Sequence, residues 1–291
     1  YNLNIDLQHI NAYAKLAERI VNRMDITTYA KRFSRKQSFT DKDMSAFLEK
    51  IGRWILRGPL EKREVILYRG ITTSVVANGG SYEEAIGLVL QAMLQSPRFI
   101  YRMENQYTGG RVGNFELAVR LSYLIWGAPP DEALYAAADQ GKLSSPEQIR
   151  IQVNRMLKDP RAVDRSVQFL SQWLNLGHLA NLRPDKNHFP RWNPSLAADM
   201  RAESIAFFKE IIWKQNRSLS DLFNAQFTYL TSQLAQHYGL TPLQIGKGTL
   251  RYDLTKIPSR GGLLTHGSVL TRGGDDTSMV TRGLFVMQDL L

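Results

Sequence analysis

The chain of 291 residues contains no cysteine. This absence excludes disulfide bonds, zinc–thiolate sites, iron–sulfur clusters and a covalently attached c-type haem within these residues. It leaves the cellular compartment open, because cytosolic and exported proteins alike can lack cysteine. The sequence also lacks an apolar run of the roughly 18 residues that would indicate a membrane-spanning helix.

No signal peptide is visible in the sequence, and the first residue is Tyr1 instead of methionine. The last residues, Leu290 and Leu291, lie inside an apolar, helix-like stretch. Native termini are rarely placed in this way, so we expect both ends to be cuts in a longer protein. The length allows one large domain or two modest domains with apolar cores.

The net charge is +10, which raises the question of nucleic-acid binding. The basic residues are spread along the chain, however, with small clusters only at 31–36 and 53–63. No recognition helix and no basic strand with interleaved aromatic residues accompanies them. The pattern favours a solvated basic surface that suits acidic partners or an anionic envelope.

Apolar residues at helical spacing predict an all-α chain made of multi-helix modules. The predicted caps support this fold: Thr40 and Ser81 before their helices, Ser145 with Pro146 and Gln148 in a capping box, and Gly239 after a helix. No pair of strands is predicted, although residues 65–76 are compatible with one or two short strands. After Leu240 the chain is rich in glycine, and only 284–291 is predicted to be helical.

Glycines and changes of pattern predict four segments. Residues 1–28 form an N-terminal helix that ends a preceding module, 29–108 a first helical module, 109–240 a central helical module, and 241–291 the start of a C-terminal module. The clearest linker is the run of glycines at Gly109, Gly110 and Gly113.

Local motifs for catalysis or metal binding are scarce. None of the five histidines belongs to an HExxH pair, so no metal site is predicted. His237 is interpreted as a helix-end residue, and His178 and His188 as parts of a solvated loop. The run 246–249 does not have the spacing of a phosphate loop. Glu203 and Glu210 are interpreted as exposed helix charges, which argues against a hydrolase.

One segment, 260–282, combines glycines with polar and ionisable residues. Its glycines allow the backbone to approach a ligand closely, and arginines there can bind a carboxylate bidentately. His266 is the candidate catalytic acid–base group or iron ligand. The candidate cofactor-binding residues are Arg260, Arg272, Thr277, Ser278 and Arg282. The alternative is a purely structural role, in which the polar side chains of this segment hydrogen-bond within their own turns.

Four stretches carry a resemblance to a known kind of protein. The first is 29–104, with SYEEAI at 81–86 and LQAMLQSPRFIYR at 90–102, and the second is FELAVRLSYLIW at 115–126. The third consists of short motifs: DPR at 159–161, QWL at 172–174, FTYL at 227–230 and HYG at 237–239. The fourth is RGGLLTHGSVLT at 260–271, followed by Thr277, Ser278 and Arg282. In this order they resemble planctomycete-type secreted multidomain proteins, which are built from helical domains of unknown function and often carry cytochrome c-like modules.

The resemblance implies an exported protein, periplasmic or at the cell surface, and a c-type haem bound by a CxxCH motif beyond Leu291. It favours a helical scaffold of a haem-associated redox protein, in which 260–282 lines a cofactor or substrate pocket. The alternative is a non-catalytic envelope module that binds partner proteins or polysaccharide. Other modules of the same polypeptide, redox proteins and polysaccharide-degrading enzymes are the expected partners, and nucleic acid is not.

Overall fold

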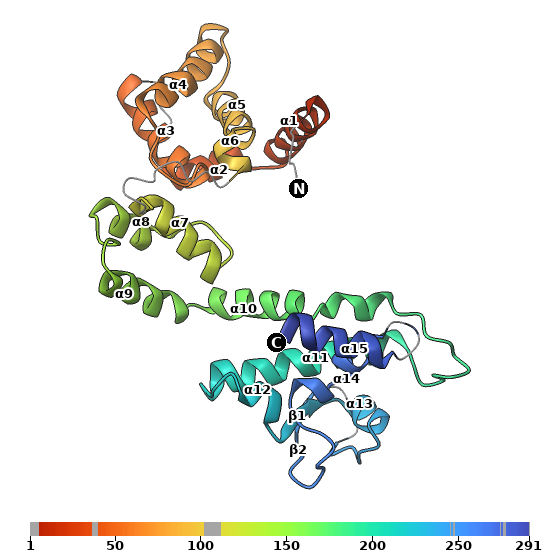
Figure 1. The fold of residues 1–291 in the computed structure, drawn as a ribbon. Helices are drawn as coiled ribbons and strands as arrows, with labels where there is room; N and C mark the ends of the chain where they lie inside the picture. The colour runs from red at the N-terminus through yellow and green to blue at the C-terminus, as the bar shows by residue number, and fades with distance from the viewer. Residues whose placement is uncertain are drawn as a thin grey trace. The chain divides into compact units, whose positions relative to one another are not determined.

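The computed structural model describes residues 6–36, 40–101, 112–244, 246, 248–273, 275 and 278–290. The chain divides into two compact units, residues 1–155 (unit 1) and 156–291 (unit 2), each of which is considered by itself (Figure 1). Helices dominate the described residues, so the predicted helical fold class is confirmed. Within these residues no helix is long and apolar enough to cross a bilayer. The four predicted segment boundaries stay predictions.

Unit 1 is built from helices. They are α1 (Leu7–Val21), α2 (Ile26–Lys31), α3 (Asp41–Ile55), α4 (Lys62–Ala77), α5 (Tyr82–Leu94), α6 (Pro97–Ile100), α7 (Asn114–Ile125), α8 (Glu132–Asp139) and α9 (Pro146–Leu157), whose last two residues belong to unit 2. Its main core lies between α3 and α5, where Phe47, Leu48 and Ile51 pack with Ile86 and Met93.

The predicted helix starts are confirmed. Thr40 and Ser81 each accept a hydrogen bond from the backbone N–H three residues on, at 3.4 and 3.1 Å. Ser145 and Gln148 form the predicted capping box, with distances of 3.3 and 3.2 Å. These side chains satisfy N–H groups that have no partner inside the helix, so the local sequence alone places the helix ends.

The suggestion of strands at residues 65–76 is wrong, because this stretch lies inside α4. Its β-branched residues favour strands locally. The buried side chains are Tyr68, Thr72 and Val75, however, and their spacing of four and three residues is that of a helix. Packing against α5 therefore overrides the local preference.

Unit 2 joins helices to a small sheet. Its elements are α10 (Pro160–Trp173), η1 (Leu176–Asn181), α11 (Pro194–Phe208), η2 (Lys209–Lys214), α12 (Asp221–Asn224), β1 (Phe227–Leu230), α13 (Ser232–His237), β2 (Leu250–Asp253), η3 (Leu263–Thr265), α14 (Gly267–Leu270), α15 (Met279–Phe285) and η4 (Val286–Leu290). Helix α11 contacts β1, α13 and α14, which are drawn below it in Figure 1.

Strands β1 and β2 correct the expectation that no strands pair. They are antiparallel, with Phe227 opposite Asp253 and Leu230 opposite Leu250. Both strands have only four residues and are far apart in the sequence, so no hairpin turn indicates the pairing. The stretch after Leu240 also holds more helix than expected, since α14 is helical and α15 begins at Met279.

Candidate functional site

Unit 2 contains a cavity of about 470 Å³, here called the arginine pocket. Arg191, Arg260 and Arg282 line it together with His188 and His237. Its apolar lining includes Leu182, Phe189, Trp192, Met200 and Leu270. A mainly apolar cavity of this size with a few convergent polar groups is typical of a small-molecule site.

The arginine pocket carries an excess of positive charge. Neither Arg191 nor Arg282 has a carboxylate partner among the described residues, and Asp275 is the one carboxylate in the lining there. Arg260 lies over the ring of Tyr238 at 3.6 Å and donates to the carbonyl oxygen of Thr265 at 3.2 Å. Guanidinium groups without carboxylate partners are suited to bind an anion.

The positive charge of the arginine pocket also affects the pKa of His237. Partial burial lowers the pKa of its imidazole, and the cations Arg191 and Arg260 lower that pKa further. A negatively charged ligand between these arginines would remove the repulsion. The helix-end interpretation of His237 holds for its position, since it is the last residue of α13, but its side chain also faces the pocket.

Behind the arginine pocket lies a buried polar cluster centred on Glu203 of α11. Its Oε1 accepts a hydrogen bond from the Thr228 hydroxyl at 2.7 Å, and its Oε2 accepts one from the Tyr238 hydroxyl at 2.6 Å. The Tyr238 oxygen in turn accepts from the backbone N–H of Gly267 at 2.6 Å. Tyr238 lines the pocket, so this cluster fixes one of its walls.

His266 belongs to the buried cluster and is only 2% exposed. Its Nδ1 lies 3.1 Å from the Ser204 hydroxyl, and its Nε2 lies 3.5 Å from Thr228 and 3.9 Å from Glu203. The ring packs edge-on against Phe207. Serine, histidine and a carboxylate thus meet, but these groups are enclosed, so the geometry favours a positioning role for His266 over contact with a ligand.

Burial lowers the pKa of His266; nearby Glu203 offsets this in part, and Arg260 adds to the lowering. Below about pH 6.5 the unfolded chain gains a proton on this imidazole that the folded chain binds less readily. The free energy of unfolding is therefore expected to fall as the pH drops from 6.5 to 5, by up to about 1.4 kcal/mol per pH unit. Urea unfolding at several pH values measures this slope.

A variant His266→Gln should lose this contribution to the slope, even if it is less stable at every pH. His237→Gln is the matched control and should change the slope less, because the His237 imidazole is only partly buried at the pocket whereas His266 is enclosed. An equal slope in the wild type and in His266→Gln would contradict the prediction.

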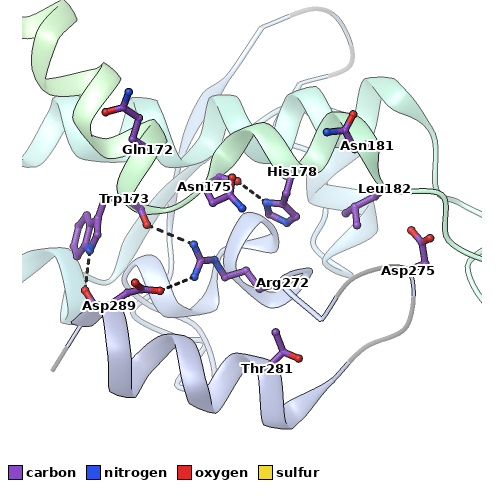
Figure 2. A pocket seen from close by; sticks show the side chains of 10 residues that line it. All are labelled: Gln172, Trp173, Asn175, His178, Asn181, Leu182, Arg272, Asp275, Thr281 and Asp289. Atoms are coloured by element: carbon purple, nitrogen blue, oxygen red, sulfur yellow. Dashed lines mark hydrogen bonds and ion pairs between the residues drawn. The ribbon is translucent and has the colours of Figure 1, made fainter. Parts of the chain in front are cut away.

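The remaining candidate residues lie elsewhere. Arg272 lies in a second cavity, where it contacts Asp289 at 3.3 Å and the carbonyl oxygen of Trp173 at 3.4 Å (Figure 2). Ser278 caps α15 by accepting from the N–H of Thr281. Thr277 lies outside the described residues. The structure therefore brings Arg260 and Arg282 to one pocket and separates them from Arg272.

The interpretation of Glu203 and Glu210 as exposed charges is wrong, because Glu203 is only 1% exposed and the Glu210 side chain only 14%. A signal was available, since Glu203 stands three residues after Met200 and four before Phe207, both of which are apolar residues on the buried face of α11. Tyr238 and Arg191 are two polar residues of the arginine pocket that were not among the candidates from the sequence. They come from separate segments, so no local pattern relates them to Arg282.

Within the described residues, no group of three or more histidine, aspartate or glutamate side chains is arranged to hold a metal ion. The chain is thus a mainly α-helical protein whose second unit contains an arginine-lined cavity. Residues 112–240 match the family PSD4, described as a protein of unknown function (DUF1592), and residues 43–104 match PSD5, described likewise (DUF1595). No curated protein and no solved structure matches the chain.

Proposed function

We propose that this chain is a helical binding module whose arginine pocket takes an amphipathic organic anion. The observation that carries the proposal is the convergence of Arg191, Arg260 and Arg282 on an otherwise largely apolar cavity. The apolar walls would take the body of the ligand, and Arg191 and Arg282 would bind its carboxylate. Tyr238, held by Glu203 and Gly267, forms a fixed surface beside them.

The haem-linked redox function is the more specific form of this proposal. Haem propionates are carboxylates, and Arg260 and Arg282 are suited to bind such groups. His266 does not fit the role of iron ligand, since both its ring nitrogens face groups of the buried cluster and it does not line the pocket. In this form, the helices and the arginine pocket act as a scaffold for a haem whose iron ligands lie outside the described residues.

We further propose that the protein acts in the bacterial envelope, exported to the periplasm or the cell surface. The support for this location is the sequence resemblance described above. The assembly of partner proteins or polysaccharide remains the alternative function, and it does not require a charged ligand in the arginine pocket.

The pocket is tested by calorimetric titration with 2-naphthoate, an apolar ring system that carries one carboxylate. We expect saturable binding, and binding at least tenfold weaker for the neutral 2-naphthamide. Arg191→Met and Arg282→Met should each weaken naphthoate binding about tenfold, because each removes one charge-assisted hydrogen bond. Arg201→Met, which removes an exposed arginine of α11 outside the pocket lining, is the charge-matched control.

Titration with haemin, followed by its absorption spectrum, tests the haem-linked redox function separately. A spectral shift that saturates and that Arg282→Met weakens would support a haem-binding scaffold. Naphthoate binding without any haemin response would retain the anion site and remove the haem. If neither probe binds, or if Arg201→Met is as harmful as Arg282→Met, the pocket proposal is wrong and the assembly function is favoured.

A further inference from the structure

The second cavity of unit 2 has a volume of about 690 Å³ and is here called the polar pocket (Figure 2). It is formed by the end of α10, by η1, and by Arg272 with α15 and η4. In Figure 2, Arg272 lies between Trp173 and Asp289 on one side and Asn181 and Asp275 on the other. Anion binding in the arginine pocket does not use this cavity, and a saccharide ligand here would be a specific form of the polysaccharide alternative.

The lining of the polar pocket contains one arginine and two carboxylates, in contrast to the excess of positive charge in the arginine pocket. Its one arginine, Arg272, is paired with Asp289, bonded to a backbone carbonyl and packed on the Phe285 ring at 3.5 Å. Asp275 adds a second carboxylate to the lining. Since the only cation of the lining is already paired, the pocket has no electrostatic preference for an anion.

The polar pocket has hydrogen-bonding groups that are not used by the protein. The side-chain amides of Asn175 and Asn181 make no hydrogen bond within the described part of the chain, and both line the cavity. Each amide presents an acceptor oxygen beside two N–H donors. Such a pair matches two neighbouring hydroxyl groups, which donate and accept in the same way.

The positions of these two amides suggest an extended ligand. Asn175 precedes η1 and Asn181 ends it, so they are six residues apart along a 3₁₀-helix. At about 2.0 Å per residue, the two positions are roughly 12 Å apart, which is longer than one sugar ring. Trp173 and Leu182, which flank this stretch of the chain on either side, add apolar groups to the lining.

We infer that the polar pocket binds a neutral oligosaccharide, with the amides of Asn175 and Asn181 bound to hydroxyl groups of neighbouring sugar units. The inference does not rest on anion binding in the arginine pocket. A site built to hydrogen-bond hydroxyl groups discriminates strongly against ligands that lack them, because its own polar groups would then be unpaired.

The test uses the full chain and four probes: the β-1,4-linked hexamers of glucose, xylose and mannose, and the hexamer of galacturonic acid. Binding is measured by calorimetry and by saturation-transfer NMR. The double variant Asn175→Gly/Asn181→Ala removes both amides. Asn175 has a left-handed backbone with φ of 46°, which glycine adopts without strain, and Asn181 is exposed, so the fold should be retained.

We expect at least one neutral hexamer to bind and the double variant to weaken that binding at least tenfold. Asn216→Gly is the matched control, because Asn216 is exposed, has φ of 47° and does not line the polar pocket. Arg282→Met should retain neutral sugar binding within twofold, which separates this site from the arginine pocket.

Three results would overturn the inference. They are the failure of every neutral hexamer to bind, binding of the galacturonic acid hexamer alone, and neutral binding that the double variant leaves unchanged. A loss of neutral binding in Arg282→Met but not in the double variant would place the sugar in the other cavity, and would overturn it as well.

Discussion

Replacement of Gly262 by alanine is expected to destabilise unit 2 by roughly 4 kcal/mol or more, which few single substitutions reach. Two independent costs add at this position. Its backbone has φ of 65° and ψ of 175°, a region occupied almost only by glycine. In addition, a Cβ atom would lie 2.3 Å from the backbone carbon and oxygen of Phe223.

The close approach cannot be relieved by a side-chain rotation, since the atoms that a Cβ would meet belong to the main chain of Phe223. The Gly262 N–H also donates to the Ala225 carbonyl at 3.0 Å, so moving the backbone away would break this bond. Gly262 precedes η3 and His266. Its loss is therefore expected to disturb the buried cluster and the arginine pocket together.

Two glycines of unit 2 provide controls for the Gly262→Ala measurement. Gly239 has φ of 75°, but a Cβ atom added there would meet no other atom, so Gly239→Ala should lower the free energy of unfolding by only about 1 kcal/mol. Gly177 has open space and no positive φ, so Gly177→Ala should be nearly neutral. Urea and thermal unfolding rank the three variants. A cost for Gly262→Ala no larger than that for Gly239→Ala would show that the close approach is absent.

Removal of the Glu203 carboxylate is expected to have the second-largest effect. Glu203→Leu leaves the hydroxyls of Thr228, which is buried, and of Tyr238, which is partly buried, without their acceptor. Each buried polar group without a partner costs about 1 to 3 kcal/mol, so we expect a loss of roughly 3 kcal/mol in the free energy of unfolding.

Glu203→Gln tests the hydrogen bonds separately from the packing. The amide has nearly the same shape and retains one acceptor oxygen, so we expect a smaller loss of about 1 to 2 kcal/mol. Glu210→Gln is the control on the same continuous helical stretch. The partly buried Glu210 carboxylate binds the exposed Lys214 at 3.2 Å and accepts a hydrogen bond from Gln215 at 2.9 Å. The amide keeps an acceptor oxygen and the lost ion pair reaches solvent, so we expect a loss of about 1 kcal/mol or less. Equal losses in Glu203→Leu and Glu210→Gln would contradict the assigned role of the cluster.

Glu203→Gln also connects the cluster to ligand binding. Tyr238 donates to the Glu203 carboxylate and forms part of the arginine pocket. Weaker naphthoate binding in a folded Glu203→Gln variant would show that the buried carboxylate positions the wall of the pocket. Unchanged binding would limit Glu203 to stability.

The helices and several of their ends could be predicted from the sequence, because capping is decided within four residues. Thr40, Ser81 and Ser145 bond to backbone groups of their own first turn, and no distant part of the chain is needed. The choice of 260–282 as a candidate segment also came from local composition. Two residues of this segment, Arg260 and Arg282, line one cavity, and their role there stays a prediction.

Other features depend on groups that meet only in the folded chain. The strand preference of residues 65–76 is outweighed by packing on α5, and β1 pairs with a strand that no short turn connects to it. Glu203 is charged and hence favours an exposed position, yet it is buried because Thr228 and Tyr238 supply hydrogen bonds from elsewhere in unit 2. Long-range packing likewise places Arg272 and Arg282 in different cavities. Local sequence determined where helices begin, whereas long-range contacts decided which side chains share a pocket, since burial is a property of the packed chain.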